Sequence, residues 1–169
     1  MRFVIRSQPI IKSCVYALLC LCLLLFSSSF FPALRLTHGV PVLLVAAISL
    51  LARFEGIRYA SFFAVIFGAA EAFMLGKNTL VYPLFYLGFA FGCMWLFENF
   101  FVTNFFAWYG YTLCGIAVYL GLSLFAPVSD WGVTAAELLF YTTLPSFVLS
   151  AALSLPLYPV FAKVKRKTG

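Results

Sequence analysis

The sequence predicts an all-α integral membrane protein, a six-helix transmembrane bundle with both the N-terminus and the C-terminus in the cytoplasm. Of its 169 residues, 64% are hydrophobic and only 9% are charged, whereas about a quarter of the residues of a soluble domain are charged. Apolar runs long enough to cross a bilayer follow one another with short polar breaks. Residues 16–26 are apolar on every face, which indicates helices and not the strands of a membrane barrel. We expect one transmembrane domain over residues 1–169.

The first two runs differ in length. Residues 13–31 follow a basic start that includes Lys12. A cleaved signal peptide is an alternative, but the apolar core is long for one and no Ala-x-Ala site follows, so we predict a retained helix. The second run, residues 40–52, has only thirteen residues and ends at Arg53. It either spans with help from its flanks or re-enters the side that it came from.

Four longer runs follow, at residues 59–75, 79–97, 105–125 and 133–162. The last run contains Pro145, Pro156 and Pro159. Proline is tolerated in membrane helices because neighbouring groups satisfy the freed carbonyls, but it bends them. We therefore expect a bent sixth helix.

The distribution of positive charge tests the number of spans independently. With six spans and the N-terminus inside, nine of the eleven Lys and Arg residues fall inside, and only Arg35 and Lys77 fall outside. The nine are Arg2, Arg6, Lys12, Arg53, Arg58, Lys163, Lys165, Arg166 and Lys167. Without a crossing at residues 40–52, the later spans would be inverted relative to this bias, unless the N-terminus also changed sides. The charges therefore predict that the short run crosses.

The net charge of +6 does not indicate a nucleic-acid partner, because the positive residues are scattered along the predicted membrane edges. The exception is the cluster from Lys163 to Lys167 near the end of the chain. We interpret this cluster as a topology anchor that faces the anionic headgroups of the lipid bilayer.

Small residues spaced four apart let membrane helices approach closely. Such grooves occur at Ala64, Gly68, Ala72 and Gly76, at Gly88 and Gly92, and at Ser146, Ser150 and Ser154. Two interpretations stay open, namely packing within this bundle and docking of another protein's membrane helix. The first two grooves, together with Glu71, are the candidate partner-binding residues. Arg53, Glu55 and Arg58 are candidates for contacts in the cytoplasmic loop, with simple positive-inside charge as the alternative.

Glu71 is the most unusual residue, because a carboxylate inside a span must be solvated by something. It lies three residues after Gly68, in the predicted outer half of its helix, and Glu137 lies at a similar depth. Two nearby carboxyls can share a proton or receive a cationic group of a ligand. Alternatively, Glu71 is protonated or bonded to Tyr or Ser hydroxyls and only locks the packing of the helices.

Catalytic and cofactor signatures do not occur in the sequence. There is no Walker loop, no Gly-x-Ser-x-Gly elbow and no paired His and Glu, and His38 is the single histidine. Five cysteines lie in apolar runs without a Cys-x-x-Cys pair, which argues against a metal site. Aromatic pairs such as Trp108 and Tyr109 are interpreted as interfacial lipid anchors, with a stacking site for a ligand as the alternative. We predict no enzyme, no cofactor and no bound metal.

Six short motifs follow one another along residues 40–169. They are Pro41-Val42-Leu43-Leu44, Ala52-Arg53-Phe54-Glu55-Gly56, Gly68-Ala69-Ala70-Glu71, Gly76-Lys77-Asn78-Thr79-Leu80 and, in the last run, Leu144-Pro145-Ser146-Phe147 and Leu157-Tyr158-Pro159. In this order and spacing they resemble the rod-shape-determining protein family MreD, small multi-pass proteins of bacterial cell-wall elongation.

This resemblance implies a non-enzymatic scaffold of the elongasome in the bacterial cytoplasmic (inner) membrane. Such a scaffold binds a single-pass MreC-like protein through membrane helices. It links MreB filaments indirectly to peptidoglycan synthesis by RodA and a class B penicillin-binding protein. Cell shape is the process in which it acts.

A second class is the substrate-binding S subunit of an energy-coupling-factor vitamin transporter, which is similar in size and hydrophobicity and also has about six helices. Those subunits commonly carry an Ala-x-x-x-Ala docking pair in the first helix. Here Ala17 is followed four residues later by Leu21. The sequence therefore favours the scaffold over the transporter subunit.

Overall fold

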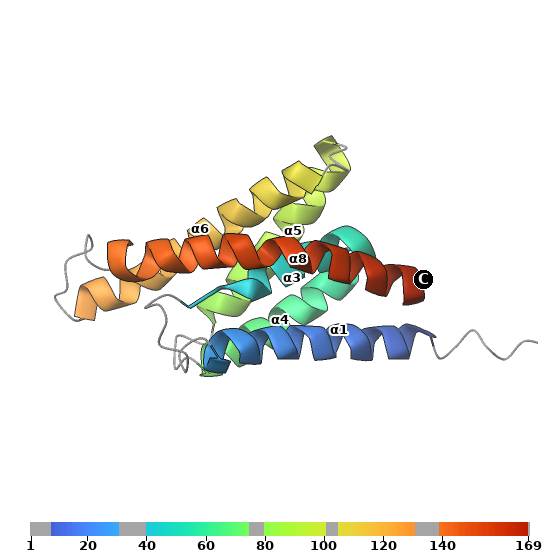
Figure 1. Ribbon diagram of the computed structural model, residues 1–169, viewed down its shortest axis with the longest axis horizontal. Helices are drawn as coiled ribbons and strands as arrows, with labels where there is room; N and C mark the ends of the chain where they lie inside the picture. The colour runs from blue at the N-terminus through green and yellow to red at the C-terminus, as the bar shows by residue number, and fades with distance from the viewer. Residues whose placement is uncertain (1–7, 31–39, 75–79, 101–104, 131–138, 169) are drawn as a thin grey trace, which may run out of the picture.

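The structure, a computed structural model, describes residues 8–30, 40–74, 80–100, 105–130 and 139–168. These residues form six α-helices in the order shown in Figure 1. They are α1 (Gln8–Leu25), α3 (Leu43–Glu55), α4 (Ile57–Met74), α5 (Val81–Phe100), α6 (Phe105–Asp130) and α8 (Leu144–Thr168). Two short π-helical stretches, η1 (Phe26–Phe30) and η2 (Leu139–Thr143), extend α1 at its end and α8 at its start.

Five of these helical stretches are long and apolar enough to cross a membrane. They are Lys12–Ser29, Ile57–Met74, Val81–Asn99, Phe105–Leu124 and Leu139–Arg166. Large apolar side chains point away from the bundle on these helices, and Phe73 and Phe106 are each 83% exposed. In water such a surface would be unfavourable, but lipid tails solvate it. The chain is therefore an all-α, multi-pass membrane protein.

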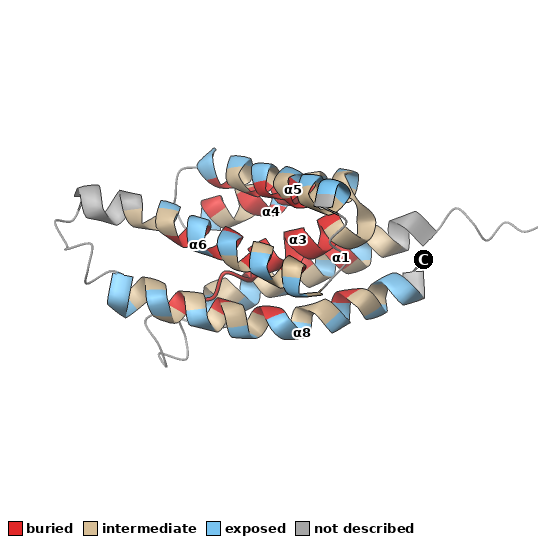
Figure 2. Cartoon of the chain, turned by 90° about the horizontal axis from the view of Figure 1, so that it is seen from above, coloured by how far each residue is buried: buried red, intermediate tan, exposed pale blue. Residues whose placement is uncertain are grey.

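The short run at residues 40–52 lies inside the bundle. Its helix, α3, has thirteen residues and begins only at Leu43, after the non-helical residues 40–42. Every residue from Pro41 to Ala52 is buried, and Figure 2 shows α3 as a red core between α4, α5, α6 and α8. Since α3 is too short to qualify as a span by length, the sixth crossing stays a prediction.

Successive helices run in alternate directions along the bundle (Figure 1). Lys12, near the start of α1, forms an ion pair with Glu55 at the end of α3. Phe105, at the start of α6, contacts Tyr158 in the second half of α8, with ring centroids 5.0 Å apart. Arg53 lies over Phe97 near the end of α5. These contacts place the first residues of α1 and the last residues of α8 at one end of the bundle.

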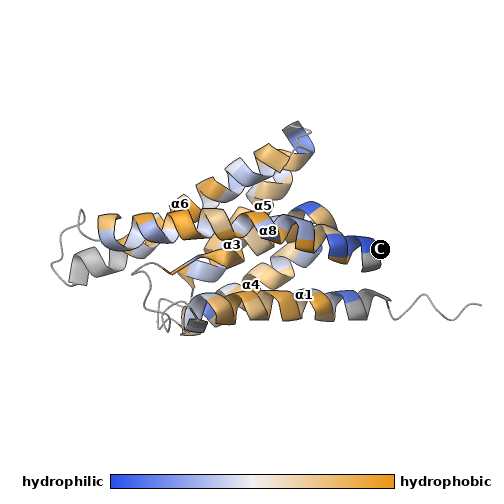
Figure 3. Ribbon diagram, viewed as in Figure 1, coloured by the Kyte–Doolittle hydropathy of each residue, from blue (hydrophilic) through white to orange (hydrophobic). Residues whose placement is uncertain are grey.

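We call this end the basic end, because seven cationic residues of the described chain lie there: Lys12, Arg53, Arg58, Lys163, Lys165, Arg166 and Lys167. Figure 3 shows the hydrophilic last turns of α8 at this end, beyond the apolar middle of the bundle. The residues that the positive-inside count places together are thus gathered in space. Which side of the membrane this end faces stays a prediction. Arg2 and Arg6 lie outside the described residues.

The predicted loop from Arg53 to Arg58 is wrong. Helix α3 continues to Glu55 and α4 begins at Ile57, so that a single residue, Gly56, joins the two helices. Gly56 has a φ of 86°, a conformation that residues with a Cβ atom rarely adopt. Arg53 and Glu55 are therefore residues of the last turn of α3, and Arg58 belongs to the first turn of α4.

The last helix extends beyond the end of its predicted range of 133–162, while residues 133–138 of that range lie outside the described residues. After η2, α8 runs from Leu144 to Thr168 and includes Pro156 and Pro159. Pro145 stands at the second position of α8, directly after the π-helical stretch, and is therefore the seventh residue of one continuous helical stretch over residues 139–168. Because proline has no N–H and its ring crowds the preceding turn, it interrupts the α-helical hydrogen bonds of that turn, which is where the π-helical stretch lies. Helix α6 continues to Asp130, but its stretch that is apolar enough to cross a membrane, Phe105–Leu124, agrees with the predicted span at 105–125.

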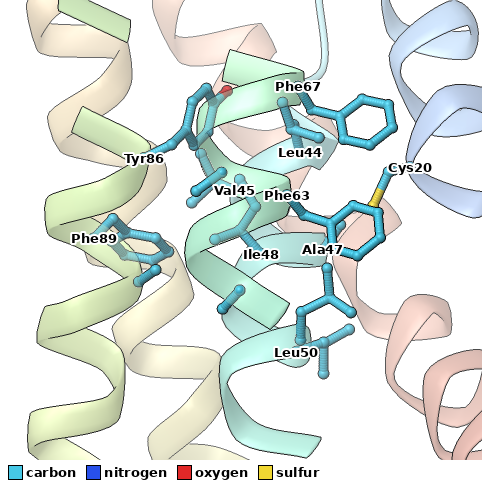
Figure 4. Packing of buried hydrophobic residues seen from close by; sticks show 14 of the residues in the cluster. Cys20, Leu44, Val45, Ala47, Ile48, Leu50, Phe63, Phe67, Tyr86 and Phe89 are labelled. Carbon is cyan, nitrogen blue, oxygen red and sulfur yellow. The ribbon is translucent and has the colours of Figure 1, made fainter. Parts of the chain in front are cut away.

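The core is built around α3. Figure 4 shows Ile48 of α3 among Phe63 of α4 and Phe89 of α5, with Cys20 of α1 on the far side of the same cluster. Ile48 is fully buried and the two phenylalanines are nearly so. A helix that is apolar on all sides is expected to lie in such a position.

Candidate functional site

Glu71 lies in α4, in the half of the bundle away from the basic end, and two tyrosines bind its carboxylate. The Tyr86 hydroxyl of α5 donates a hydrogen bond to Oε2 at 2.5 Å, and the Tyr119 hydroxyl of α6 donates one to Oε1 at 2.8 Å. Both tyrosines are nearly inaccessible. The chain itself therefore supplies the polar contacts that an intramembrane carboxylate needs.

Gly68 makes this geometry possible. A Cβ atom at Gly68 would lie 2.8 Å from Cδ2 of Tyr86 and 2.9 Å from Cα of Pro83. A side chain at this position would therefore push α5 away from α4, and the Tyr86 hydroxyl away from Glu71 one turn later. The small residue acts in close packing of two helices of the same chain.

Aromatic rings enclose the tyrosines of this cluster. The ring centroid of Tyr119 lies 5.4 Å from that of Tyr82 and 5.8 Å from that of Phe85. Tyr86 lies 5.9 Å from Tyr119. These contacts join α5 to α6 around the carboxylate and fix the hydroxyls in place. The arrangement favours the alternative in which Glu71 locks the packing of the helices.

A second polar site holds the non-helical segment before α3. The backbone N–H of Val40 donates to Oγ of Ser146 at 2.9 Å, and that of Val42 donates to Oγ of Ser150 at 2.7 Å. Each serine in turn donates to the carbonyl four residues earlier in its helix, that of Thr142 or of Ser146. These serines were predicted as a groove for close helix packing, and they additionally accept hydrogen bonds from backbone N–H groups that lie outside a helix.

A third polar network crosses the middle of the core. Nε1 of Trp108 donates to Oγ of Ser49 at 2.9 Å, and the hydroxyls of Ser49 and Thr112 are 3.1 Å apart. All three residues are fully buried. The prediction that Trp108 is an interfacial lipid anchor is therefore wrong. A serine within an otherwise apolar thirteen-residue run was the only sequence signal for this network.

The basic end carries the fourth polar group of residues. Nζ of Lys12 lies 2.6 Å from Oε2 of Glu55, and the Tyr16 hydroxyl donates to Oε1 of Glu55 at 2.9 Å. The guanidinium of Arg53 lies over the rings of Tyr158 and Phe97, with Cζ 5.3 Å and 5.4 Å from their centroids. Glu55 thus ties α1 to α3, and Arg53 packs against α5 and α8.

The small residues among the predicted partner-binding positions differ in their surroundings. Ala64, Gly68 and Ala72 are buried beneath neighbouring helices, so the chain itself fills that groove. Gly92 faces Tyr111 of α6, whose hydroxyl would lie 2.6 Å from an added Cβ atom. Gly88 is exposed, with open space where a Cβ atom would be. Gly76 lies outside the described residues.

Other predicted residues also have definite positions. Arg58 is exposed. The buried thiols of Cys20 and Cys93 lie in the core, while Cys14, Cys22 and Cys114 are exposed, and all five are free. Glu137 and His38 lie outside the part of the chain that the structure describes, so the idea of a paired carboxyl with Glu71 stays a prediction.

Comparisons with protein-family models, with curated proteins and with solved structures found no match to this chain.

Proposed function

We propose that this chain is a non-enzymatic scaffold of the bacterial cell-wall elongation machinery in the cytoplasmic membrane. It binds a single-pass MreC-like protein through its membrane helices. Through that partner it connects MreB to peptidoglycan synthesis by RodA and a class B penicillin-binding protein. The basic end faces the cytoplasm, in accord with the positive-inside bias.

The observation that best supports a scaffold is that the polar interior is satisfied from within. Each buried side-chain nitrogen or oxygen of the described residues has a hydrogen-bond partner. Glu71 accepts hydrogen bonds from Tyr86 and Tyr119. A subunit that captures a vitamin needs convergent polar groups with capacity for the ligand. Here those groups are committed to contacts between helices.

A scaffold with its polar groups directed inward offers partners its exposed helix surfaces. On α5, the exposed residues Leu84, Gly88, Phe91 and Trp95 lie along one face. Gly88 gives this face a point where another helix backbone can approach closely. We assign the contact with the MreC-like partner to this face.

The test is co-purification of the full chain with a single-pass MreC-like protein from a membrane extract. Gly88→Leu is expected to weaken capture about tenfold or more, because the added side chain blocks close approach. Gly110→Leu is the matched control, since Gly110 of α6 is also exposed with open space around it. If both variants capture the MreC-like protein equally well, the partner does not bind the α5 face.

Analysis of small molecules in the same purified preparation distinguishes the scaffold from a transporter S subunit. A scaffold retains no small metabolite and does not bind an energy-coupling transmembrane subunit. A vitamin retained through purification and lost on Glu71→Gln would overturn the scaffold and support the S-subunit function. Capture of the MreC-like protein without a retained metabolite would support the scaffold.

A further inference from the structure

We propose that the basic end is a binding site for an anionic phospholipid, with Arg53 and Lys165 holding the phosphate above a platform of aromatic rings. The platform consists of Phe54, Phe97, Phe105 and Tyr158. This inference goes beyond the proposed scaffold function and does not depend on it.

The basic end carries more positive than negative charge. The basic end gathers seven cationic residues of the described chain, contributed by α1, α3, α4 and α8. Two described carboxylates lie at this end, those of Glu55 and Glu98. Lys12 and Tyr16 hold Glu55 at 2.6 Å and 2.9 Å. The end therefore has an excess of positive charge, which attracts an anion most strongly where the dielectric constant is low.

The positions of Arg53 and Lys165 indicate where at the basic end an anion would bind. Cζ of Arg53 lies 6.0 Å from the ring centroid of Phe54, and Nζ of Lys165, from a different helix, lies 5.5 Å from the same centroid. Two cations from different helices thus lie beside one ring, where a phosphate can accept charge-assisted hydrogen bonds from each.

The rings of the platform hold the Arg53 side chain in place. Each of its rings comes from a different helix, α3, α5, α6 and α8. Tyr158 lies 5.6 Å from Phe54 and 5.0 Å from Phe105 between ring centroids. Arg53 is held over Tyr158 at 5.3 Å and over Phe97 at 5.4 Å. Since its position is set by packing, little side-chain entropy is lost when a ligand binds.

The location favours a lipid over an acidic protein segment. The site lies where apolar helices end, which is the depth of the headgroups in a bilayer. Aromatic rings there suit the glycerol and the first carbons of the acyl chains, and the cations suit the phosphate. Lys163 and Arg166 are exposed beside the site and add to the attraction for an anionic headgroup.

The experiment uses the full chain in nanodiscs of phosphatidylcholine with an increasing fraction of phosphatidylglycerol. Native mass spectrometry measures the lipids that stay bound. We expect phosphatidylglycerol to be retained in preference to phosphatidylcholine. Lys165→Gln and Arg53→Gln are each expected to weaken this retention about fivefold, since each removes one cation near the headgroup.

Arg58→Gln is the matched control. It removes the same charge from the same end, but from an exposed position in the first turn of α4. It is expected to change retention less than twofold. Lys165 is exposed, so its variant tests the site even if Arg53→Gln fails to fold.

Three outcomes would overturn the proposal. Equal effects of Arg58→Gln and Lys165→Gln would mean that charge acts diffusely and that no site exists. Equal retention of the two lipids would mean that the site does not select an anion. Displacement of phosphatidylglycerol by a soluble acidic peptide at equal concentration would mean that the site is built for an acidic protein segment.

Discussion

Helices α1 and α3 are both apolar, but they occupy opposite environments. Helix α1 is long enough to cross a bilayer, and only Tyr16, Cys20 and Leu24 of its described side chains are buried. Helix α3 is too short to qualify by length, and all of its residues up to Ala52 are buried. The longer helix is therefore the more exposed of the two, and the shorter helix is the more buried.

The difference follows from backbone hydrogen bonding. Lipid can solvate the outside of a complete helix, because the backbone bonds of that helix are internal. It cannot solvate the backbone of residues 40–42, which lie before the first turn of α3, where the N–H groups of Val40 and Val42 have no partner within a helix. Ser146 and Ser150 bind the N–H groups of Val40 and Val42. A short helix with an unwound entry is stable only when other helices surround it.

The largest effect is expected from a cavity in α3. Leu50 is fully buried, and Leu50→Ala should lower the free energy of unfolding by about 2 to 5 kcal/mol. Leu18 of α1 is 62% exposed, and Leu18→Ala should change it by less than about 0.5 kcal/mol. Unfolding in mixed detergent micelles measures both. Similar losses for both variants would contradict the contrast between the helices.

The next largest change in the free energy of unfolding is expected where α4 packs closely against α5. Gly68→Leu places atoms against the backbone of Pro83, and overpacking of this kind should cost about 1 to 3 kcal/mol. Gly88→Leu, at an exposed site, is the matched control and should cost less than about 0.5 kcal/mol. The same unfolding assay applies. If Gly68→Leu is tolerated as well as Gly88→Leu, α4 and α5 are not in the close contact described.

The serine contacts test the support of the unwound segment. Ser150→Ala leaves the buried N–H of Val42 without its partner, which should cost about 1 to 3 kcal/mol. Ser146→Ala should cost less, because Val40 is 40% exposed. Hydrogen exchange at the Val42 amide should accelerate in Ser150→Ala and stay slow in Ser146→Ala. The reverse order would show that burial does not govern these two bonds.

The smallest effect concerns the attachment of α1. The ion pair between Lys12 and Glu55 joins α1 to α3, with side-chain exposures of 17% and 6%. Lys12→Gln should cost about 1 kcal/mol, because Glu55 loses its cation but keeps the hydrogen bond from Tyr16. High salt should change this loss little, because both side chains are largely shielded from solvent. A loss of about 3 kcal/mol or more, as for an unpaired buried charge, would show that α1 is bound as firmly as α3.

The polar interior shows what sequence reasoning found and what it missed. It identified Glu71 as the residue that needs an explanation and named tyrosine hydroxyls as one of its partners. It did not select Tyr86 and Tyr119 among nine tyrosines, since no local pattern relates residues 15 and 48 positions away. The network of Ser49, Thr112 and Trp108 was missed for the same reason.

The sequence by itself determined the membrane class and the long apolar helices, because these depend on local composition and length. It also determined which cations share one end, because the positive charges recur at alternate breaks between the runs. Only the tertiary structure decided that α3 lies in the centre, that Gly56 alone separates it from α4, and that the groove at Gly68 is filled by α5. These features depend on which helix faces which, and a pattern that is apolar on every side carries no such information.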